Sequence, residues 1–412
     1  MTRIAKLSLV ALVVATVAVA GCKKKDDNNK SKKKKKPTTT GKVQPKPQPM
    51  AKKLEGEALL PIDDKCWKAF DAEDAKAFAD CYADKVDFAL VGQVPMTPGE
   101  KESATTRDGV MALVKPYWAM VKLKTTPDLT LVNGSNIAVV ARAETTNDAD
   151  VGPMKATNKT AKTWQGQVGT FDDKGKITTD HHYWDSNSVM GQLGMAPLKK
   201  GQYRDAWTKG YWDSPLKVVA KNDDKEKKNV DAYKALVAAF NSGDAKKFMA
   251  FAADDIQMHH MDMPMDHDTK AKVEALVKMF YTAFPKATLT PKNTWAAGDW
   301  TVAEVTFKGK NAGPIPGLAP KPTNNEVTSD FLHVAQWENG KIKQFFVFTN
   351  GFNMWAQLYP KKLEAMKKDM AKKMGAGAAP APKKGEAPKK GAAPAKGMKK
   401  APMKKAPAPA KK

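Results

Sequence analysis

The clearest hydrophobic pattern lies in the second half of the chain, where apolar residues recur at the spacing of an amphipathic helix. Tyr233, Leu236, Val237 and Phe240 fall on one helical face. The Asn-Ser-Gly tripeptide that follows is typical of a helix end, and Asp244 is well placed to cap the N-terminus of a second helix. The pattern therefore predicts a pair of short helices.

A third helix and three strands are predicted after this pair. The helix covers 271–284 and ends at Pro285. Strand-like runs occupy 300–307, 326–337 and 341–350, with a Glu-Asn-Gly turn between the last two. Three helices followed by antiparallel strands predict an α+β unit, with the helices packed on one face of a curved sheet.

The same pattern occurs earlier in the chain. Residues 69–78 align with 239–248 at a shift of 170, and Gln192-Leu193 aligns with Gln357-Leu358 at a shift of 165. The spacing predicts two similar units, each large enough for its own core. We expect a signal peptide at 1–21, a Lys/Pro-rich disordered tether at 22–58, domains at 59–200 and 228–370 joined by a linker at 201–227, and a disordered tail rich in Ala, Pro and Lys at 371–412.

The N-terminus has the layout of a signal peptide, with a positive start and an apolar stretch at 7–20 that is short for a membrane span. The stretch ends in Val-Ala-Gly-Cys22, which resembles the bacterial lipobox. This resemblance implies that Cys22 is acylated and anchors a bacterial envelope lipoprotein to a lipid membrane. The alternative is an ordinary signal peptide that ends near a cysteine. Because Lys23 is not the Asp that retains enterobacterial lipoproteins at the inner membrane, we expect the outer membrane.

The net charge of +25 is confined to the flanks. Residues 23–53 carry 13 Lys and 2 Asp, and residues 371–412 carry 13 Lys and 1 Glu, so that 54–370 is neutral overall. No folded basic surface is therefore expected, and no specific nucleic acid. Such flanks lack the apolar content to fold. They are either contacts for anionic envelope polymers and lipid headgroups or solvated spacers without a partner.

The order of elements resembles the SnoaL-like polyketide and ester cyclases of the NTF2-like superfamily. The resemblance covers about 65–200 and 228–360 and is carried by the motifs at 175–177, 183–185, 192–194, 280–285, 313–317 and 337–342. It implies two cone-shaped half-barrels, each with three helices on a curved, mostly antiparallel sheet that encloses an apolar pocket. Family members commonly pair through the sheet, so sheet pairing within this chain or in a homodimer is expected.

The resemblance also implies a place for acid/base chemistry, because an Asp on the last strand of these cyclases works beside a His. Asp185 is at the matching position, and strand alternation puts His181 and Tyr183 on the same face. These three residues are the candidate catalytic set. The alternative is that Asp185 only caps the segment 186–193.

The second unit departs from this pattern, because Phe346, Phe348 and Asn350 replace the three candidate catalytic residues. Asn does not titrate, so we expect a pocket without acid/base machinery. His333 shares a strand face with Trp337 on the preceding strand. These five residues are the predicted lining of a pocket for a small apolar or amphipathic ligand.

A methionine- and histidine-rich segment at 258–268 offers a different chemistry. Its His259, His260, Met263, Met265 and His267 combine thioether and imidazole groups, which favour copper. The alternative is a methionine-lined rim of the pocket, in a loop between the second and third helices. No other cofactor is expected.

Two cysteines remain after Cys22. Cys66 and Cys81 correspond by the shift of 170 to Leu236 and Phe251, so they can meet if those apolar residues touch across the helix pair. They form either a disulfide, as expected in an oxidising compartment, or two small buried thiols. The leading hypothesis is a membrane-anchored protein that binds a small ligand. The alternatives are an isomerase, cyclase or hydrolase acting through Asp185 and a copper-binding envelope protein.

Overall fold

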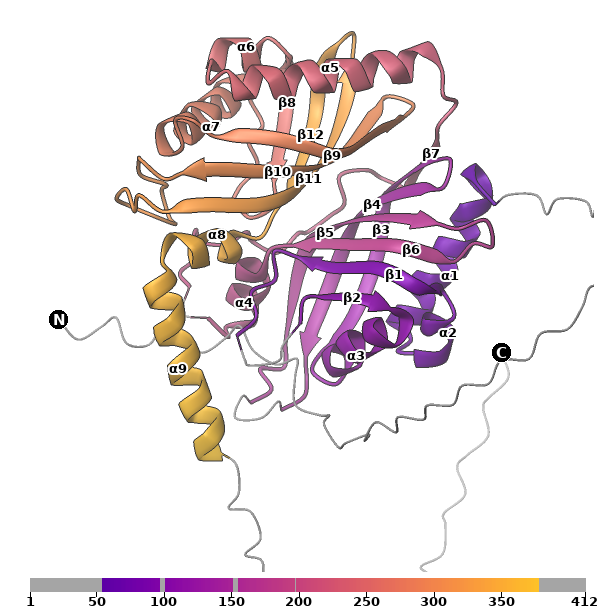
Figure 1. The fold of residues 1–412 in the computed structure, drawn as a ribbon, viewed down its shortest axis with the longest axis vertical. Helices are drawn as coiled ribbons and strands as arrows, with labels where there is room; N and C mark the ends of the chain where they lie inside the picture. The colour runs from indigo at the N-terminus through magenta and orange to yellow at the C-terminus, as the bar shows by residue number, and fades with distance from the viewer. Residues whose placement is uncertain (1–53, 97–100, 151–154, 197, 378–412) are drawn as a thin grey trace, which may run out of the picture.

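Residues 54–96, 101–150, 155–196 and 198–377 are described by the structure, a computed structural model, and they form two α+β units (Figure 1). Cys22, the expected signal peptide and the lysine-rich stretch that follows Cys22 lie outside the described residues. Within these ranges, no helix combines the length and the apolar character needed to cross a membrane.

The first unit is built on a seven-stranded sheet in the order β2-β1-β6-β5-β4-β3-β7. Its elements are η1 (Gly56–Leu59), α1 (Leu60–Asp71), α2 (Ala75–Ala79), β1 (Tyr82–Val91), β2 (Ser103–Thr106), α3 (Arg107–Trp118), β3 (Lys122–Asn133), β4 (Asn136–Asn147), β5 (Lys159–Phe171), β6 (Ile177–Trp184), α4 (Ser186–Leu193) and β7 (Leu216–Val219). The β1–β6 and β3–β7 pairs are parallel, and the other pairs are antiparallel. Strand β7 lies within the expected linker, so that part of the linker belongs to the first sheet.

The second unit has a five-stranded sheet in the order β8-β12-β11-β10-β9, of which only the β8–β12 pair is parallel. Its elements are α5 (Asp224–Asn241), α6 (Ala245–Met249), β8 (Ala252–His260), α7 (Lys270–Ala283), β9 (Thr288–Ala297), β10 (Trp300–Lys310), β11 (Glu326–Glu338), β12 (Lys341–Phe348), α8 (Gly351–Leu358) and α9 (Pro360–Gly377).

The predicted helices and the three predicted strands of the second unit are confirmed, and two details are corrected. Strand β8 occupies part of the segment expected to be a loop between the second and third helices. The tail expected to begin at 371 is helical as far as Gly377, because Ala, Lys and Met favour a helix. Helix α9 follows α8 at one side of the molecule (Figure 1), and its Met366 and Met370 are buried in a cluster with Val94 and Met96 of the first unit.

The internal repeat is visible in how the second helix of each unit begins. Asp74 accepts hydrogen bonds from the backbone N–H groups of the next turn, and Asp244 does the same for α6. The residue before each cap has a left-handed backbone, with φ of 55° at Glu73 and 69° at Gly243. The two units therefore share one turn geometry, which only the second builds with glycine.

The two units pack against each other through their sheets. Helices α1–α3 and α5–α7 lie on opposite outer sides, with the sheets between them (Figure 1). A single buried cluster joins apolar residues of the two sheets: Leu129, Leu131, Ala138, Val140, Trp164, Val168 and Tyr183 with Met261, Trp295, Ala297, Trp300, Val302, Leu332, Val334, Phe346 and Phe348. A Cβ at Gly166 would lie 2.7 Å from Leu332 Cδ2, so the sheets approach closely there. Each unit also has its own core beneath its helices.

The linker between the units takes part in this packing. The rings of Trp164 and Tyr211 have centroids 4.3 Å apart, and those of Trp212 and Trp300 are 5.8 Å apart. Trp207 donates a hydrogen bond from Nε1 to the carbonyl of Thr163. The linker aromatics thus contact both sheets.

Candidate functional site

Each unit has a cavity between its helices and the inner face of its sheet. The cavity of the first unit has a volume of about 70 Å³. Its lining is Trp67, Phe70, Phe78, Phe88, Leu90, Leu113, Val114, Tyr117, Leu123, Ala143, Thr145, Thr163, Gln165, His182, Trp184 and Val189. Aromatic and aliphatic groups from the helices therefore face a sheet that contributes a histidine and several uncharged polar groups.

A buried carboxylate holds that histidine. Asp180 Oδ1 lies 3.1 Å from Nε2 of His182, and the Asp180 side chain is almost fully buried. Tyr82 donates its hydroxyl to Asp180 Oδ2 at 2.5 Å, and Gln167 donates its amide to Oδ1 at 2.7 Å. Burial alone would raise the pKa of Asp180, but His182 and these hydrogen bonds hold it below its usual value. Asp180 is therefore an ionised carboxylate whose partners include an imidazole in the cavity wall.

A second carboxyl group is buried behind this pair. Asp63 on α1 is 2 % exposed. Burial raises its pKa to about 8, and the negative charge of Asp180 raises it further in the same direction. Asp63 is therefore protonated at neutral pH, next to an ionised Asp180.

The cavity of the second unit, about 50 Å³, is more apolar. Thirteen of its fifteen lining residues are apolar, and the other two are histidines: Leu236, Val237, Phe240, Phe248, Met258, His260, Leu276, Val277, Phe280, Leu289, Phe307, Phe331, His333, Phe345 and Val347. Nδ1 of His333 lies 2.8 Å from the hydroxyl of Tyr233. Burial, together with His260, lowers the pKa of His333 to about 3, so this ring is neutral at physiological pH.

The residues expected to form a catalytic set are not brought together in either cavity. His181 and Tyr183 point to the opposite face of β6, where Glu304 of the second sheet accepts hydrogen bonds of 2.7 Å from both side chains. Burial would lower the pKa of His181, but Glu304 raises it above its usual value. Side chains alternate along β6 as predicted. However, the face of β6 that lines the cavity carries His182 and not His181 or Tyr183.

Asp185 caps α4, which is the alternative that the sequence left open. It accepts hydrogen bonds from the backbone N–H and the hydroxyl of Ser188 at 2.8 and 2.6 Å. Its other oxygen accepts the backbone N–H of Gly351 from the second unit at 3.2 Å. Burial and the nearby Asp262 raise the pKa of Asp185 to about 6. Asp185 therefore lies at the junction of the two units and outside the lining of both cavities.

The predicted pocket lining of the second unit needs a similar correction. His333 lines the cavity, but Phe346 and Phe348 belong to the cluster between the sheets. Asn350 caps α8 and donates to Ser186 Oγ at 2.9 Å. Trp337 is buried in the core and donates its Nε1 to Thr301 Oγ1 at 2.8 Å. Phe345 and Val347, on the other face of β12, line the cavity instead.

The methionine- and histidine-rich segment does not gather its soft ligands at one point. His260 lines the cavity, His259 stacks on Phe346 between the sheets, and Met265 is 64 % exposed. Met263 packs against the core of the second unit, and burial lowers the pKa of His267. Within the described ranges, no group of three or more His, Cys, Asp or Glu side chains is arranged to hold a metal ion.

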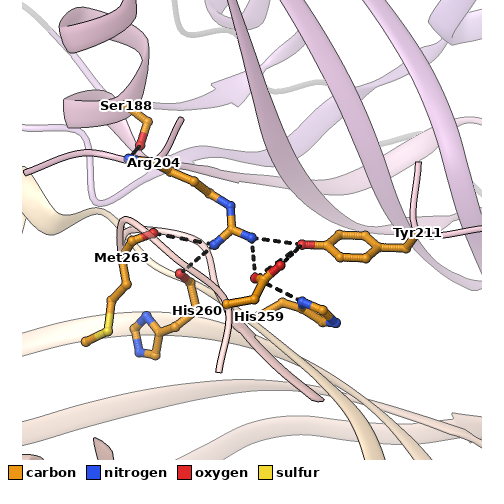
Figure 2. A network of polar contacts seen from close by, with 7 residues as sticks. Ser188, Arg204, Tyr211, His259, His260 and Met263 are labelled. Atoms are coloured by element: carbon orange, nitrogen blue, oxygen red, sulfur yellow. Dashed lines mark hydrogen bonds and ion pairs between the residues drawn. The ribbon is translucent and has the colours of Figure 1, made fainter. Parts of the chain in front are cut away.

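This segment is instead tied to the linker by Arg204 (Figure 2). The guanidinium donates to Asp266, to the hydroxyl of Tyr211 at 2.9 Å and to the carbonyl of Met263 at 3.4 Å. His259 Nδ1 lies 2.9 Å from Asp266 Oδ1. Burial alone would raise the pKa of Asp266, but His259 and Arg204 lower it to about 2. The network fixes the junction of the units.

A disulfide joins Cys66 on α1 to Cys81 in the turn between α2 and β1, with Cα atoms 5.9 Å apart. The predicted lipidation site, Cys22, lies outside the described residues.

Sequence reasoning missed Asp180, Gln167 and Glu304. Asp180 and His182 alternate on one strand, which is a signal that could have been found. Glu304 could not be found in this way, because its partners lie 121 and 123 residues away.

The sequence of the second unit matches a known protein family. Residues 230–358 match the family model described as SnoaL-like polyketide cyclase. This part of the chain is therefore similar to the SnoaL-like polyketide cyclases. A search of curated proteins finds no match.

Several solved structures are similar to part of the chain. A protein proposed to be a SnoaL-like polyketide cyclase, from a Jannaschia species, is 14% identical, with a TM-score of 0.31, covering 34% of this chain and 96% of its own. AclR, a proposed hydroxylase from Streptomyces galilaeus, is 21% identical, with a TM-score of 0.31, covering 36% of this chain and 99% of its own. An NTF2-like protein of unknown function from Burkholderia pseudomallei is 19% identical, with a TM-score of 0.28 and coverages of 32% and 97%.

Proposed function

We propose that the protein binds a small, neutral, largely apolar molecule in the cavity of its second unit. The observation that carries this proposal is the lining itself, in which thirteen of fifteen residues are apolar and His333 is neutral. Burial of apolar ligand surface contributes about 25 cal/mol per Å². A charged ligand would lose its hydration without gaining an opposite charge from this lining.

The two histidines give the cavity a limited polar selectivity. Tyr233 keeps its proton, because burial raises its pKa far above the usual value, and so it can donate to Nδ1 of His333. The remaining ring nitrogen of His333 then carries a hydrogen and can donate to a ligand carbonyl or ether oxygen. We therefore expect ligands with an apolar body and one hydrogen-bond acceptor.

Titration with the fluorescent apolar probe N-phenyl-1-naphthylamine tests this proposal. The Leu276→Trp variant fills the cavity and should weaken probe binding at least about tenfold, because the probe and the indole compete for one space. The Ala275→Trp variant is the matched control, since Ala275 is exposed on the same helix.

Two results of that titration would count against the proposal: no saturable binding by the full chain, or equal binding by both variants. A milder variant, Val277→Ile, guards against misfolding, because it adds one methylene to the same wall and should weaken binding less. Thermal unfolding of each variant shows whether the fold is retained.

We further propose that the chain is a bacterial lipoprotein anchored through acylated Cys22, with lysine-rich flanks that contact anionic envelope polymers or headgroups. The lipobox-like sequence and the confinement of the charge to the flanks support this. Labelling with an alkyne analogue of palmitate, in wild-type and Cys22→Ser cells, tests the anchor. We expect label and outer-membrane fractionation in the wild type alone. Label that persists in Cys22→Ser would contradict the assignment.

A further inference from the structure

Helix α9 is docked on the rest of the protein through its apolar face. Met366 and Met370 are buried in a cluster with Val94 and Met96, which follow β1 in the first unit, and Leu363 packs against the same cluster. Positions 363, 366 and 370 lie on one side of a helix, because they are three and four residues apart. The apolar face of α9 is therefore already covered within the chain.

The opposite face of α9 is a row of lysines. Lys361, Ala365, Lys368 and Lys372 follow one another at intervals of four, three and four residues, and all four are exposed. We call these four residues the lysine stripe. It contains no acidic residue and extends over about 17 Å, at a rise of 1.5 Å per residue. The stripe is thus a straight row of positive charge that faces solvent.

Other lysines of the helix contact groups of the protein. Nζ of Lys362 lies 3.9 Å from the centre of the Tyr359 ring, and Nζ of Lys367 lies 3.9 Å from Oε1 of Glu364. The acidic Glu364 is therefore directed to the side of the helix that carries Lys367, and the charge of the stripe is left for a partner outside the chain.

The charge of α9 sets it apart from the other long helix. Helix α5 also has 18 residues, but it carries four lysines and three acidic residues, whereas α9 carries six lysines and two acidic residues. Because 54–370 is neutral overall and 360–370 has a net charge of +2, residues 54–359 have a net charge of −2. The excess positive charge of the folded body is therefore gathered on α9, and the sequence after α9 continues it with 11 Lys and 1 Glu at 378–412.

We propose that the lysine stripe of α9 lies on an anionic lipid leaflet and holds the body of the anchored protein against the membrane. This inference rests on the proposed lipid anchor at Cys22. The link at 23–53 alone allows a separation of up to about 100 Å between the anchor and the first unit. A flat leaflet can meet all three lysines of the stripe at once, and lysines close to such a surface are attracted to it.

The contact is one of charge and not of insertion. Amphipathic helices that insert into a leaflet bury their apolar face in it. That face of α9 is buried on the protein instead, so the lysine stripe stays at the level of the lipid headgroups. We therefore expect a contact that needs anionic lipid, weakens at high salt and does not reach the acyl chains.

A fluorophore attached to Ala365→Cys, in the middle of the stripe, tests the proposal. The full lipidated protein is reconstituted in vesicles of phosphatidylcholine, with or without phosphatidylglycerol, and a nitroxide on the lipid headgroups serves as the quencher. The introduced thiol can be labelled selectively, because Cys66 and Cys81 form a disulfide and Cys22 is acylated. We expect quenching in the vesicles with phosphatidylglycerol alone, and recovery of the fluorescence at high salt.

The Lys361→Gln/Lys368→Gln/Lys372→Gln variant should lower the equilibrium constant of the surface contact at least about tenfold, because three attracted charges are lost. Glutamine retains the helix, since its helix propensity is close to that of lysine.

Helix α5 supplies the matched controls, because it covers the outer side of the second sheet, away from α9 (Figure 1). A label at Ala235→Cys, exposed on α5, should not be quenched in either kind of vesicle. The Lys227→Gln/Lys228→Gln/Lys234→Gln variant removes three exposed lysines of α5 and should leave the quenching at Ala365→Cys unchanged.

Equal quenching in the two kinds of vesicle, or equal quenching with and without the three lysines of the stripe, would overturn the proposal. A label that responds to an added anionic polysaccharide but not to phosphatidylglycerol would overturn it as well, since the stripe would then bind a polymer. Flotation of the vesicles reports the anchor separately. Protein that does not float contradicts the anchor and this inference together, whereas protein that floats without quenching contradicts this inference alone.

Discussion

The two units place different chemistry at equivalent positions of one scaffold. In the first, His182 lines the cavity and contacts the buried Asp180, which in turn interacts with Asp63, whereas the second has Val347, Phe345 and Tyr233 at these positions. Both cavities lie between three helices and a sheet, and the backs of the two sheets form one buried cluster. The shared fold therefore supplies the cavity, and a few strand residues decide whether its wall holds a carboxylate–histidine pair or only apolar side chains.

The largest effect is expected from removing the carboxylate that joins the two units. Glu304→Ala leaves His181 and Tyr183 without their common acceptor in a buried interface, and should lower the free energy of unfolding by about 3 kcal/mol. Urea unfolding followed by tryptophan fluorescence measures this. Glu338→Ala, an exposed carboxylate of the same sheet, should cost less than about 0.5 kcal/mol. Equal losses in the two variants would show that the contact does not hold the units together.

Removal of the disulfide in the first unit should lower the free energy of unfolding by a similar amount. Cys66 and Cys81 are 15 residues apart, and opening a loop of this length costs about 3 kcal/mol, whereas the second unit has Leu236 and Phe251 there. The Cys66→Ser/Cys81→Ser variant and the reduced wild type should unfold at the same lower urea concentration. Equal thiol counts with and without reductant, in denatured protein, would contradict the bond.

The buried Asp63 should make stability depend on pH. Its pKa is about 8 in the folded protein, against 3.8 for an exposed group. Between these values the folded state holds a proton that the unfolded state has released, so stability falls as the pH rises from about 4 to about 8. Asp63→Asn removes this fall, so its free energy of unfolding should exceed that of the wild type by an amount that grows steadily from about pH 4 to about pH 8. If the free energy of unfolding changed with pH in the same way in both proteins, a raised pKa of Asp63 would be ruled out.

The smallest effect concerns the turn before the second helix. Glu73 has a φ of 55°, which Gly243 adopts without strain in the other unit. Glu73→Gly should therefore stabilise the protein by about 1 kcal/mol, and Gly243→Glu should destabilise it by a similar amount. The unfolding temperatures of both variants measure these two effects. Shifts of the two temperatures in the same direction would show that the turns are not equivalent.

Local patterns predicted much of the fold. The third helix, the strands β10 to β12 and the cap at Asp244 follow from spacing, turn residues and Pro285. The short strand β8 was missed, because its sequence is dominated by Met and His, and its pairing with β12 is parallel and distant.

The site was harder to predict, because alternation separates the two faces of a strand without saying which one meets the helices. The sequence pattern predicts that His181, Tyr183 and Phe346 line cavities, yet these residues face the other sheet. A sheet that is covered on both sides has no polar face to reveal its orientation. The positions of Asp185 and Arg204 depend on contacts with the second unit, and a local sequence pattern does not reveal such contacts.

Native mass spectrometry of the full chain, purified from its own host, shows directly whether the second unit carries a ligand. The mass of a bound small molecule should appear on the wild-type protein and on the Ala275→Trp control but not on Leu276→Trp. A wild-type spectrum with the mass of the protein alone, under conditions that retain N-phenyl-1-naphthylamine when it is added, would contradict a ligand-binding second unit.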